Sequence, residues 1–487
     1  MNKKIHVMLL VLLILAVLPF LIIATCNHPL GMHEWDWVTN LKGLTTKMTF
    51  WEEQKFYYNN VMGRYSSTWI SSLSDNFYTL FRFKVFFVVN ILLIVAFIGI
   101  AVKAVFGFHN INLVMSTTSI LWLSWISGVS GIYDTLYMLT SVHTYLLGFY
   151  GLVLIFYLWR KCFNSSNFIS LFWQLVLILI ITFTIGTNEI SLIYSVMTIG
   201  LLLVFNFNSK QFRNYLIAFF VISLIFAFIS IATPANLIRK SQYASEYSFY
   251  KLIFLSFSTS VFNIITWIVN GQLILSSLLF IYLTNNIDTS KIKRIAFPYF
   301  VFIVMFSVFC GHFLIIYGTN GLSIAERVVD FIYLHFLFLW FYGLLVFSDF
   351  SIFRKLDFKN IQITNGLKIG FSVYFILVLF VSGLSINREN KSFANFFSLI
   401  EVQSNIGEAW LTILNGSAFE YDRSMKRQYQ KLEKCNSDTC YVNKPERTPK
   451  FLYFYLADRR NTNSGDPYIG YYFNPGIKAV KYSNFQY

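Results

Sequence analysis

The sequence predicts an all-α polytopic membrane protein with about 11 transmembrane helices and a small extracytoplasmic C-terminal domain. Hydrophobic residues make up 56% of the 487 residues and charged residues only 13%, whereas soluble domains carry roughly 25% charged residues. Apolar runs long enough to cross a hydrocarbon core of ~30 Å recur as far as residue 386. The chain also has 54 Phe and 30 Tyr, which suit helix interiors and the aromatic belts at membrane surfaces. Lipid is therefore the expected solvent for most of the chain.

The first apolar run, residues 5–25, follows Lys3-Lys4 and resembles a secretory signal, but it has no clear small-residue cleavage site. We therefore expect an uncleaved first helix. The later runs are expected to be membrane spans, and the eighth is long enough for a span plus an interfacial segment. They cover residues 84–106, 111–127, 138–158, 168–185, 189–206, 215–232, 252–284, 295–316, 328–347 and 369–386.

The short basic loops predict the orientation of these spans. If the spans alternate in direction, the basic segments share one side of the membrane, which the positive-inside rule makes cytoplasmic. These segments are Lys3-Lys4, Arg160-Lys161, Lys210–Arg213, Lys291–Arg294 and Arg354–Lys368. Loop 26–83 and the tail 387–487 are then extracytoplasmic. The net charge is +15, and the Lys and Arg residues are spread between apolar runs. This distribution favours residues that set the membrane topology and contact anionic lipid over a surface that binds nucleic acid.

Two domains are expected. Residues 1–386 form the transmembrane module, including loop 26–83, and residues 387–487 form a C-terminal domain on the membrane surface. The tail has too many aromatic residues for a disordered segment. Cys435 and Cys440 flank a polar loop in it, and an extracytoplasmic location would oxidise them. One disulfide is therefore predicted between these two cysteines.

Loop 26–83 carries two acidic residues, Glu34 and Asp36, among aromatic residues soon after the first span. Such a pair is able to act as a base or to hold a cation. The alternative is an interfacial loop that tryptophans anchor and whose acids are only solvated. Residues 51–58 indicate an amphipathic interfacial helix that leads to Arg64. Arg64 is a candidate for bidentate phosphate binding, or for a structural partner of Glu34 or Asp36.

Other loops on the same predicted side place polar side chains at the mouth of the helical bundle. The candidates are Asn188, Glu189, Asn236, Arg239, Lys240 and Arg327. Taken alone, each is more often a helix cap or a topology charge than a ligand. Ionisable groups at a bundle mouth are costly unless they are paired or lie in a water-filled cavity, so their clustering predicts a cavity. His143 lies near the same end of its helix, where a lone histidine is more often structural than a metal ligand.

Four segments carry a family resemblance: Glu34-Trp35-Asp36, Gly63-Arg64, Thr187-Asn188-Glu189 and Thr233-Pro234-Ala235-Asn236-Leu237-Ile238-Arg239. In this order they resemble the GT-C superfamily of membrane glycosyltransferases, and within it a bacterial family related to O-antigen-modifying glucosyltransferases. The chain departs from the family pattern at Trp35, which separates two normally adjacent acidic residues, and at Ala235, where glycine is usual.

The resemblance implies a GT-C-like module in a bacterial inner membrane, with an active site facing the extracytoplasmic side. It implies an inverting glycosyltransferase of cell-envelope polysaccharide that moves a sugar from a polyprenyl-phosphate donor to a glycan or lipid-linked acceptor. Asp36 would be the base, with Glu34 as second choice. Arg239, Arg64, Lys240 and Arg327 would stabilise the leaving phosphate, and Asn188, Glu189, Asn236 and His143 would hold the sugar or orient the arginines. Some members use a divalent cation, Mg²⁺ or Mn²⁺, and this stays open here.

Three other functions fit an apolar chain of this kind. A transporter or flippase of lipid-linked saccharides predicts ionisable residues near the bilayer midplane, whereas here most lie near one end of the spans. An O-antigen polymerase or ligase predicts a large loop between later helices, whereas here the large loop follows the first span. A non-catalytic membrane scaffold predicts a tail that binds a partner.

Overall fold

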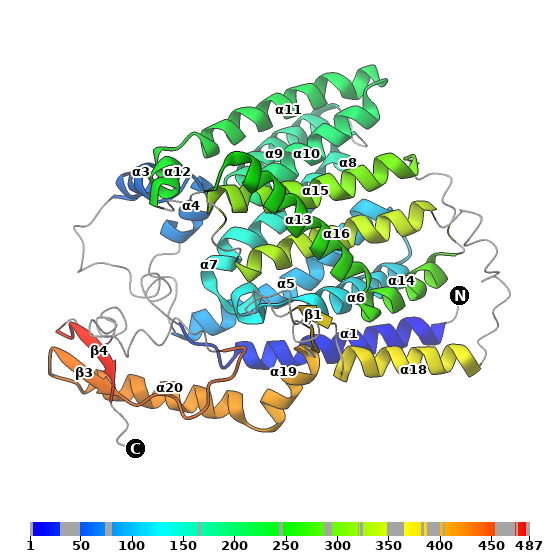
Figure 1. Cartoon of the computed structure of the whole chain (residues 1–487). Helices are drawn as coiled ribbons and strands as arrows, with labels where there is room; N and C mark the ends of the chain where they lie inside the picture. The colour runs from blue at the N-terminus through cyan, green and yellow to red at the C-terminus, as the bar shows by residue number, and fades with distance from the viewer. Residues whose placement is uncertain are drawn as a thin grey trace.

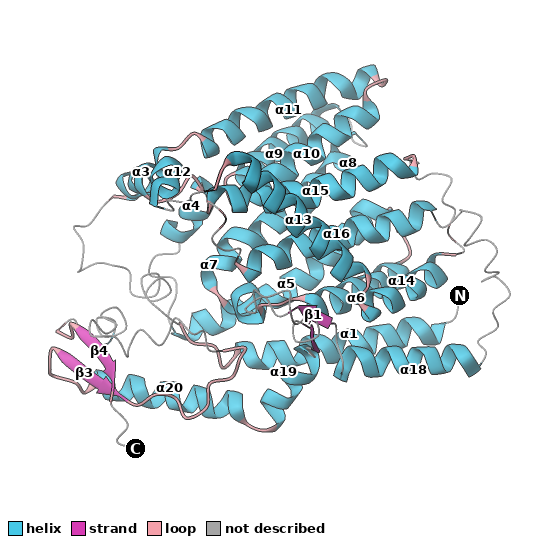
Figure 2. Cartoon of the chain, in the orientation of Figure 1, coloured by secondary structure: helices cyan, strands magenta, loops and turns pink. Residues whose placement is uncertain are grey.

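The computed structural model describes residues 3–29, 49–73, 80–163, 167–242, 247–285, 287, 295–319, 321, 325–347, 365–380, 384–386, 400–402, 405–452, 473 and 476–483. These residues form a bundle of roughly parallel and antiparallel helices (Figure 1). Helices account for nearly all of its regular structure, and strands occur only in two small sheets within the described residues (Figure 2). The predicted all-α character therefore holds for the apolar part of the chain.

Long helices follow the predicted apolar runs. They are α1 (Lys3–Ala24), α5 (Leu80–Phe106), α6 (Ile111–Gly128), α8 (Leu147–Phe163), α9 (Asn167–Ile185), α10 (Glu189–Asn206), α11 (Lys210–Ile231), α13 (Phe249–Ile268), α14 (Gly271–Thr284), α15 (Phe297–Gly318), α16 (Glu326–Phe347) and α18 (Asn365–Phe380). Among the described residues, 8 helices are long and apolar enough to cross a membrane. The chain is thus a polytopic membrane protein.

The eighth predicted run, 252–284, is two helices. The helix α13 ends at Ile268, and Asn270 begins α14 by accepting a hydrogen bond from the backbone N–H of Gln272. An Asn at this position is a strong helix start. The second helix lies inside the bundle, where Phe280 packs against Phe106 and Phe341. The predicted interfacial segment is therefore a buried helix.

The bundle has two ends, named here after the first helix as the Lys3 end and the Ala24 end. Three short helices lie together at the Ala24 end (Figure 1). They are α3 (Phe50–Asn60), α4 (Tyr65–Leu73) and α12 (Pro234–Gln242). The helix α3 agrees with the predicted interfacial helix and begins with a capping box, in which Thr49 and Glu52 satisfy each other's backbone N–H groups.

Two π-helical turns, η1 (Tyr133–Tyr137) and η2 (Val142–Leu146), connect α6 to α8 at the Ala24 end, with α7 (Leu139–Ser141) between them. All ten residues of the two turns are buried. Asn27 fixes η1 to the end of the first helix by donating to the carbonyl of Tyr137 at 3.0 Å. Because π turns are rare and concentrate at functional sites, this connection marks where a site should be sought.

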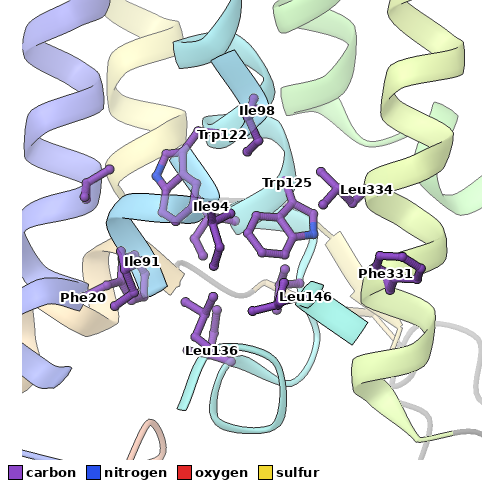
Figure 3. Close-up of a cluster of buried hydrophobic side chains, with 14 of the residues drawn as sticks. Phe20, Ile91, Ile94, Ile98, Trp122, Trp125, Leu136, Leu146, Phe331 and Leu334 are labelled. Carbon is purple, nitrogen blue, oxygen red and sulfur yellow. The ribbon is translucent and has the colours of Figure 1, made fainter. Parts of the chain in front are cut away.

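A hydrophobic core packs against these turns. Figure 3 shows side chains from α1, α5, α6, η1, η2 and α16 meeting around Trp122 and Trp125. Both tryptophan side chains are fully buried, and Trp125 Nε1 donates to the carbonyl of Asp330 at 3.1 Å. Close packing of this kind keeps the turns in place relative to α16.

The described part of the tail is attached to the bundle. It contains β1 (Leu384–Ile386) antiparallel to β2 (Ile400–Val402), the helices α19 (Asn405–Leu414) and α20 (Ser417–Glu433), and β3 (Thr439–Val442) parallel to β4 (Ala479–Tyr482). Asn405 donates to the carbonyls of Ile126 and Val129, and Trp410 Nε1 donates to the carbonyl of Leu15 at 3.0 Å. The helix α19 therefore shares the core of the transmembrane module. Cys435 and Cys440 form the disulfide that the sequence predicts.

Candidate functional site

The site is built where three of the predicted loop segments meet at the Ala24 end. The Ser230 hydroxyl donates to the carbonyl of Gly63 at 3.0 Å, and the N–H of Ser66 donates to the carbonyl of Gly186 at 3.0 Å. A Cβ at Gly63 would overlap the carbonyl oxygen of Ser230, so only glycine permits this approach. The start of α4 is thereby held between the α9–α10 turn and the α11–α12 turn.

Arg64 and Glu189 form the first ion pair of the site. Arg64 Nη2 lies 2.8 Å from Glu189 Oε2, and Arg64 Nε lies 3.0 Å from the same oxygen and 3.1 Å from Oε1. The Arg64 side chain is 14% exposed and that of Glu189 29% exposed. Burial alone would lower the pKa of Arg64, but Glu189 and the nearby ring of Tyr145 hold that pKa above its ordinary value. The guanidinium is therefore a permanent cation at the mouth.

The two asparagines that were predicted to bind sugar, Asn188 and Asn236, form hydrogen bonds with the backbone. Asn188 caps α10 by accepting from the N–H groups of Ile190 and Ser191, and its amide donates to the carbonyl of Thr144 at 2.7 Å. Asn236 donates to the carbonyl of Ser230 at 3.1 Å and so closes the α11–α12 turn. Asn188 thus has the N-cap role that an asparagine at a helix start favours, whereas Asn236 satisfies carbonyls at the end of α11.

Arg327 and Asp134 form the second ion pair, with Arg327 Nη1 3.2 Å from Asp134 Oδ2. The Asp134 side chain is 11% exposed, and Oδ1 has no hydrogen-bond partner in the part of the chain that the structure describes. Burial raises the pKa of the Asp134 carboxyl, although Arg327 opposes this shift. We refer to Arg64–Glu189 and Arg327–Asp134 together as the mouth pairs.

Asp330 anchors the start of η1 beside the second ion pair. This carboxylate is 1% exposed and accepts from the backbone N–H of Ser130 at 3.0 Å, the N–H of Gly131 at 3.2 Å and the hydroxyl of Thr135 at 2.8 Å. A buried carboxylate is tolerated when several donors satisfy it. Its contacts fix the turn that carries Asp134.

Aromatic rings join the two ion pairs across η2. The Arg64 guanidinium lies 5.9 Å from the centre of the Tyr145 ring, and that ring lies 6.2 Å from the ring of Phe331 on α16. Phe331 is one helical turn from Arg327. The Tyr145 ring of η2 therefore lies between Arg64 of the first pair and the helix that carries Arg327 of the second. His143 lies in the same turn and is 2% exposed, with its ring 5.7 Å from that of Phe86.

The remaining predicted site residues are described incompletely or not at all. Arg239 and Lys240 lie on α12 at the Ala24 end, and their side chains are outside the described part of the chain. Glu34 and Asp36 fall in residues 30–48, which also lie outside it. Among the described residues, no three His, Cys, Asp or Glu side chains are grouped as ligands of one metal ion.

Asp134 and Asp330 are two carboxylates that the sequence-based prediction did not include. Both lie within mostly apolar segments, Ile132–Leu136 and Val328–Ile332. An ionisable residue at such a place is costly and is by default a candidate functional residue. That signal would have identified both positions, but it could not have shown that Asp330 is saturated with donors while Asp134 keeps one buried oxygen without a partner among the described residues.

No family model, curated protein or solved structure matches this chain.

Proposed function

We propose that the chain is an inverting GT-C-like glycosyltransferase of a bacterial inner membrane. It would move a sugar from a polyprenyl-phosphate donor to a glycan or lipid-linked acceptor. The observation that carries the proposal is the pair of arginine–carboxylate contacts around the π-helical turns at one end of the bundle. A transferase of this class needs a base and a cation within one site, whereas a flippase would need polar groups at the midplane.

The location of basic residues supports an extracytoplasmic Ala24 end. Lys103, Arg160, Lys161 and Lys210 all lie at the Lys3 end of their helices, as expected for a cytoplasmic side. The mouth pairs lie at the other end. Donor and acceptor would therefore meet at the outer surface of the membrane.

The proposed reaction is a single displacement. The acceptor hydroxyl attacks the anomeric carbon, its proton passes to a carboxylate, and the bond to the donor phosphate breaks with the electron pair leaving on polyprenyl phosphate. Asp36 is the base that the family resemblance favours, with Glu34 second. The geometry adds Asp134, because its partly desolvated carboxylate with a raised pKa is a stronger base than an exposed one.

Arginine would stabilise the leaving phosphate in this scheme. A guanidinium carries five N–H donors, so an arginine that is already paired with a carboxylate is still able to donate to a phosphate oxygen. Arg64 and Arg327 are partly exposed at the mouth, and Arg239 and Lys240 lie on the adjacent α12. A fixed positive charge at the developing phosphate lowers the barrier without reorganisation.

Sugar transfer by the purified full chain in nanodiscs tests this proposal. The transfer activities of wild type, Asp36→Asn and Asp134→Asn would be compared, each measured with a panel of polyprenyl-phosphate sugars as donors. We expect turnover in wild type and a loss of about 10²- to 10⁴-fold in the variant that lacks the base. Asp438→Asn is the matched control, because Asp438 also pairs with a cation, Lys478, but is exposed in the tail.

Two results would contradict the proposal. One is transfer that survives the combined removal of the three candidate bases in Glu34→Gln/Asp36→Asn/Asp134→Asn, which would contradict the proposed displacement with a carboxylate base. The other is the absence of turnover with every donor, together with movement of lipid-linked saccharides across proteoliposomes, which would indicate a flippase.

A further inference from the structure

A cavity of 460 Å³ lies between the end of α1, the first turns of α5 and the tail helix α20. Four apolar residues of α5 line it, Leu80, Phe81, Val85 and Val88. These residues repeat at helical spacing and so share one face of α5. Lys84 from α5 and Lys426 from α20 also line it, and both carry ammonium groups. The cavity therefore combines an apolar wall with a cationic part.

The cationic part belongs to a cluster of four residues, His28, Lys84, Asp422 and Lys426, which we call the tail cluster. Asp422 Oδ1 accepts from His28 Nε2 at 2.8 Å and from Lys84, and Asp422 Oδ2 lies 2.6 Å from Lys426 Nζ. The Tyr429 hydroxyl donates to His28 Nδ1 at 3.0 Å. These contacts join the first helix, α5 and the tail at one place.

The tail cluster has more positive than negative charge. Burial lowers the pKa of His28 to about 4, although Asp422 opposes the shift, so His28 is neutral near pH 7. Burial would raise the pKa of Asp422, but hydrogen bonds from His28, Lys426 and Lys84 hold it well below its ordinary value. Among the described residues, two ammonium groups thus face one carboxylate, and a second anion would complete the balance.

The apolar wall continues along α5 beyond the cavity. Val85, Val89 and Leu92 are 42%, 46% and 50% exposed, and they follow one another at helical spacing on a helix long and apolar enough to cross a membrane. A soluble anion such as free phosphate would make no contact with these exposed apolar residues. An anionic lipid would place its headgroup between the lysines and an acyl chain along this stripe.

We propose that this groove binds the phosphate headgroup of an anionic membrane lipid in the leaflet at the Ala24 end. Lys84 and Lys426 would contact the phosphate, and Val85 and Val88 would contact the first part of an acyl chain. Binding would link α20 to α5 and so stabilise the attached tail. This lipid site is separate from the mouth pairs and does not depend on the proposed transferase activity.

Lipid binding to the full chain in detergent, followed by native mass spectrometry, tests this proposal. The probes are dioleoyl phosphatidylglycerol, dioleoyl phosphatidylcholine and inorganic phosphate. We expect wild type to prefer the anionic lipid and the double variant Lys84→Gln/Lys426→Gln to bind it about 30-fold more weakly, since a lysine near an anionic lipid contributes roughly one kcal/mol. Lys431→Gln, an exposed change on the same helix α20, is the matched control.

A second variant covers the case in which loss of the lysines disturbs folding. Val85→Trp fills the groove from an exposed position without altering any charge, and it should also weaken binding of phosphatidylglycerol. The proposal is overturned if the double variant binds the lipid like wild type, or if Lys431→Gln weakens binding equally. It is also overturned if inorganic phosphate binds as tightly as the lipid and Val85→Trp has no effect, because the groove would then take a soluble anion.

Discussion

The mouth pairs and the tail cluster are both built from carboxylates and cations, but their charge balance differs. Among the described residues, each mouth carboxylate is paired with one arginine, whereas Asp422 of the tail cluster has two lysines and a histidine. At the mouth, burial raises the pKa of the Asp134 carboxyl although Arg327 opposes the shift, and this favours uptake of a proton. A cluster with excess positive charge instead holds its carboxylate ionised and attracts a further anion.

The two regions should also respond to pH in opposite directions. Burial raises the pKa of Asp134 at the mouth, so its contribution to stability is present at low pH and is lost as the pH rises through the folded-state value. The pKa of Asp422 is held low, so its contribution is present above the unfolded value and is lost as the pH falls. A titration therefore distinguishes a region suited to proton transfer from a region that holds two segments together.

The largest effect on attachment of the tail is expected from titration of His28. Its folded-state pKa of about 4 lies below the ordinary value of ~6.5, so the detached state takes up a proton over this interval while the attached state does not. Attachment of α20 should weaken by about 3 kcal/mol as the pH falls from 6.5 to 4. Hydrogen–deuterium exchange of residues 417–433, corrected for the intrinsic rate at each pH, measures this change. His28→Gln should flatten the pH dependence, and a slope that this variant keeps would assign the effect to another group.

A smaller loss of tail attachment is expected from Asp422→Asn. The change leaves Lys84 and Lys426 close together without their shared carboxylate, which should weaken attachment of α20 by about 2 kcal/mol after allowance for the exposure of Lys426. The same exchange measurement at pH 7 reports it. Asp438→Asn removes a pair whose two side chains are more than two-thirds exposed and should change little. Equal effects of the two substitutions would mean that the tail cluster does not hold the tail in place.

The apolar part of the fold was predictable because lipid leaves few alternatives. A run of about twenty apolar residues must satisfy its own backbone hydrogen bonds, and a helix does so. The described helices accordingly follow the predicted runs, from α1 (Lys3–Ala24) for the run 5–25 to α18 (Asn365–Phe380) for the run 369–386. Convergence of Gly63-Arg64 with Asn188-Glu189 was also predictable, since the loops on one side of alternating spans share one surface.

Other features depend on contacts that leave no local signal. The two π turns each admit one extra residue per turn, which neither composition nor periodicity of residues 133–146 reveals. The tail is attached through His28 and Asp422, which are 394 positions apart, and through α19 against α1. Helix α19 is amphipathic in sequence, but only the fold shows that Ile406 and Ala409 are buried and that Trp410 bonds to Leu15 of α1.

The smallest of the expected effects comes from Arg64→Lys, and it compares the two regions most directly. Lysine keeps the positive charge but loses the planar fork that reaches both oxygens of Glu189 and lies near the ring of Tyr145. We expect sugar transfer to fall about tenfold, which corresponds to roughly 1.4 kcal/mol. Arg447→Lys is the control, because Arg447 pairs with Glu420 at the same distance of 2.8 Å but in an exposed part of the tail, and it should leave transfer unchanged. If Arg64→Lys and Arg447→Lys lose equal activity, the loss is not specific to the arginine at the mouth. If only Arg64→Lys loses activity, the geometry of the arginine, and not its charge alone, matters at the mouth.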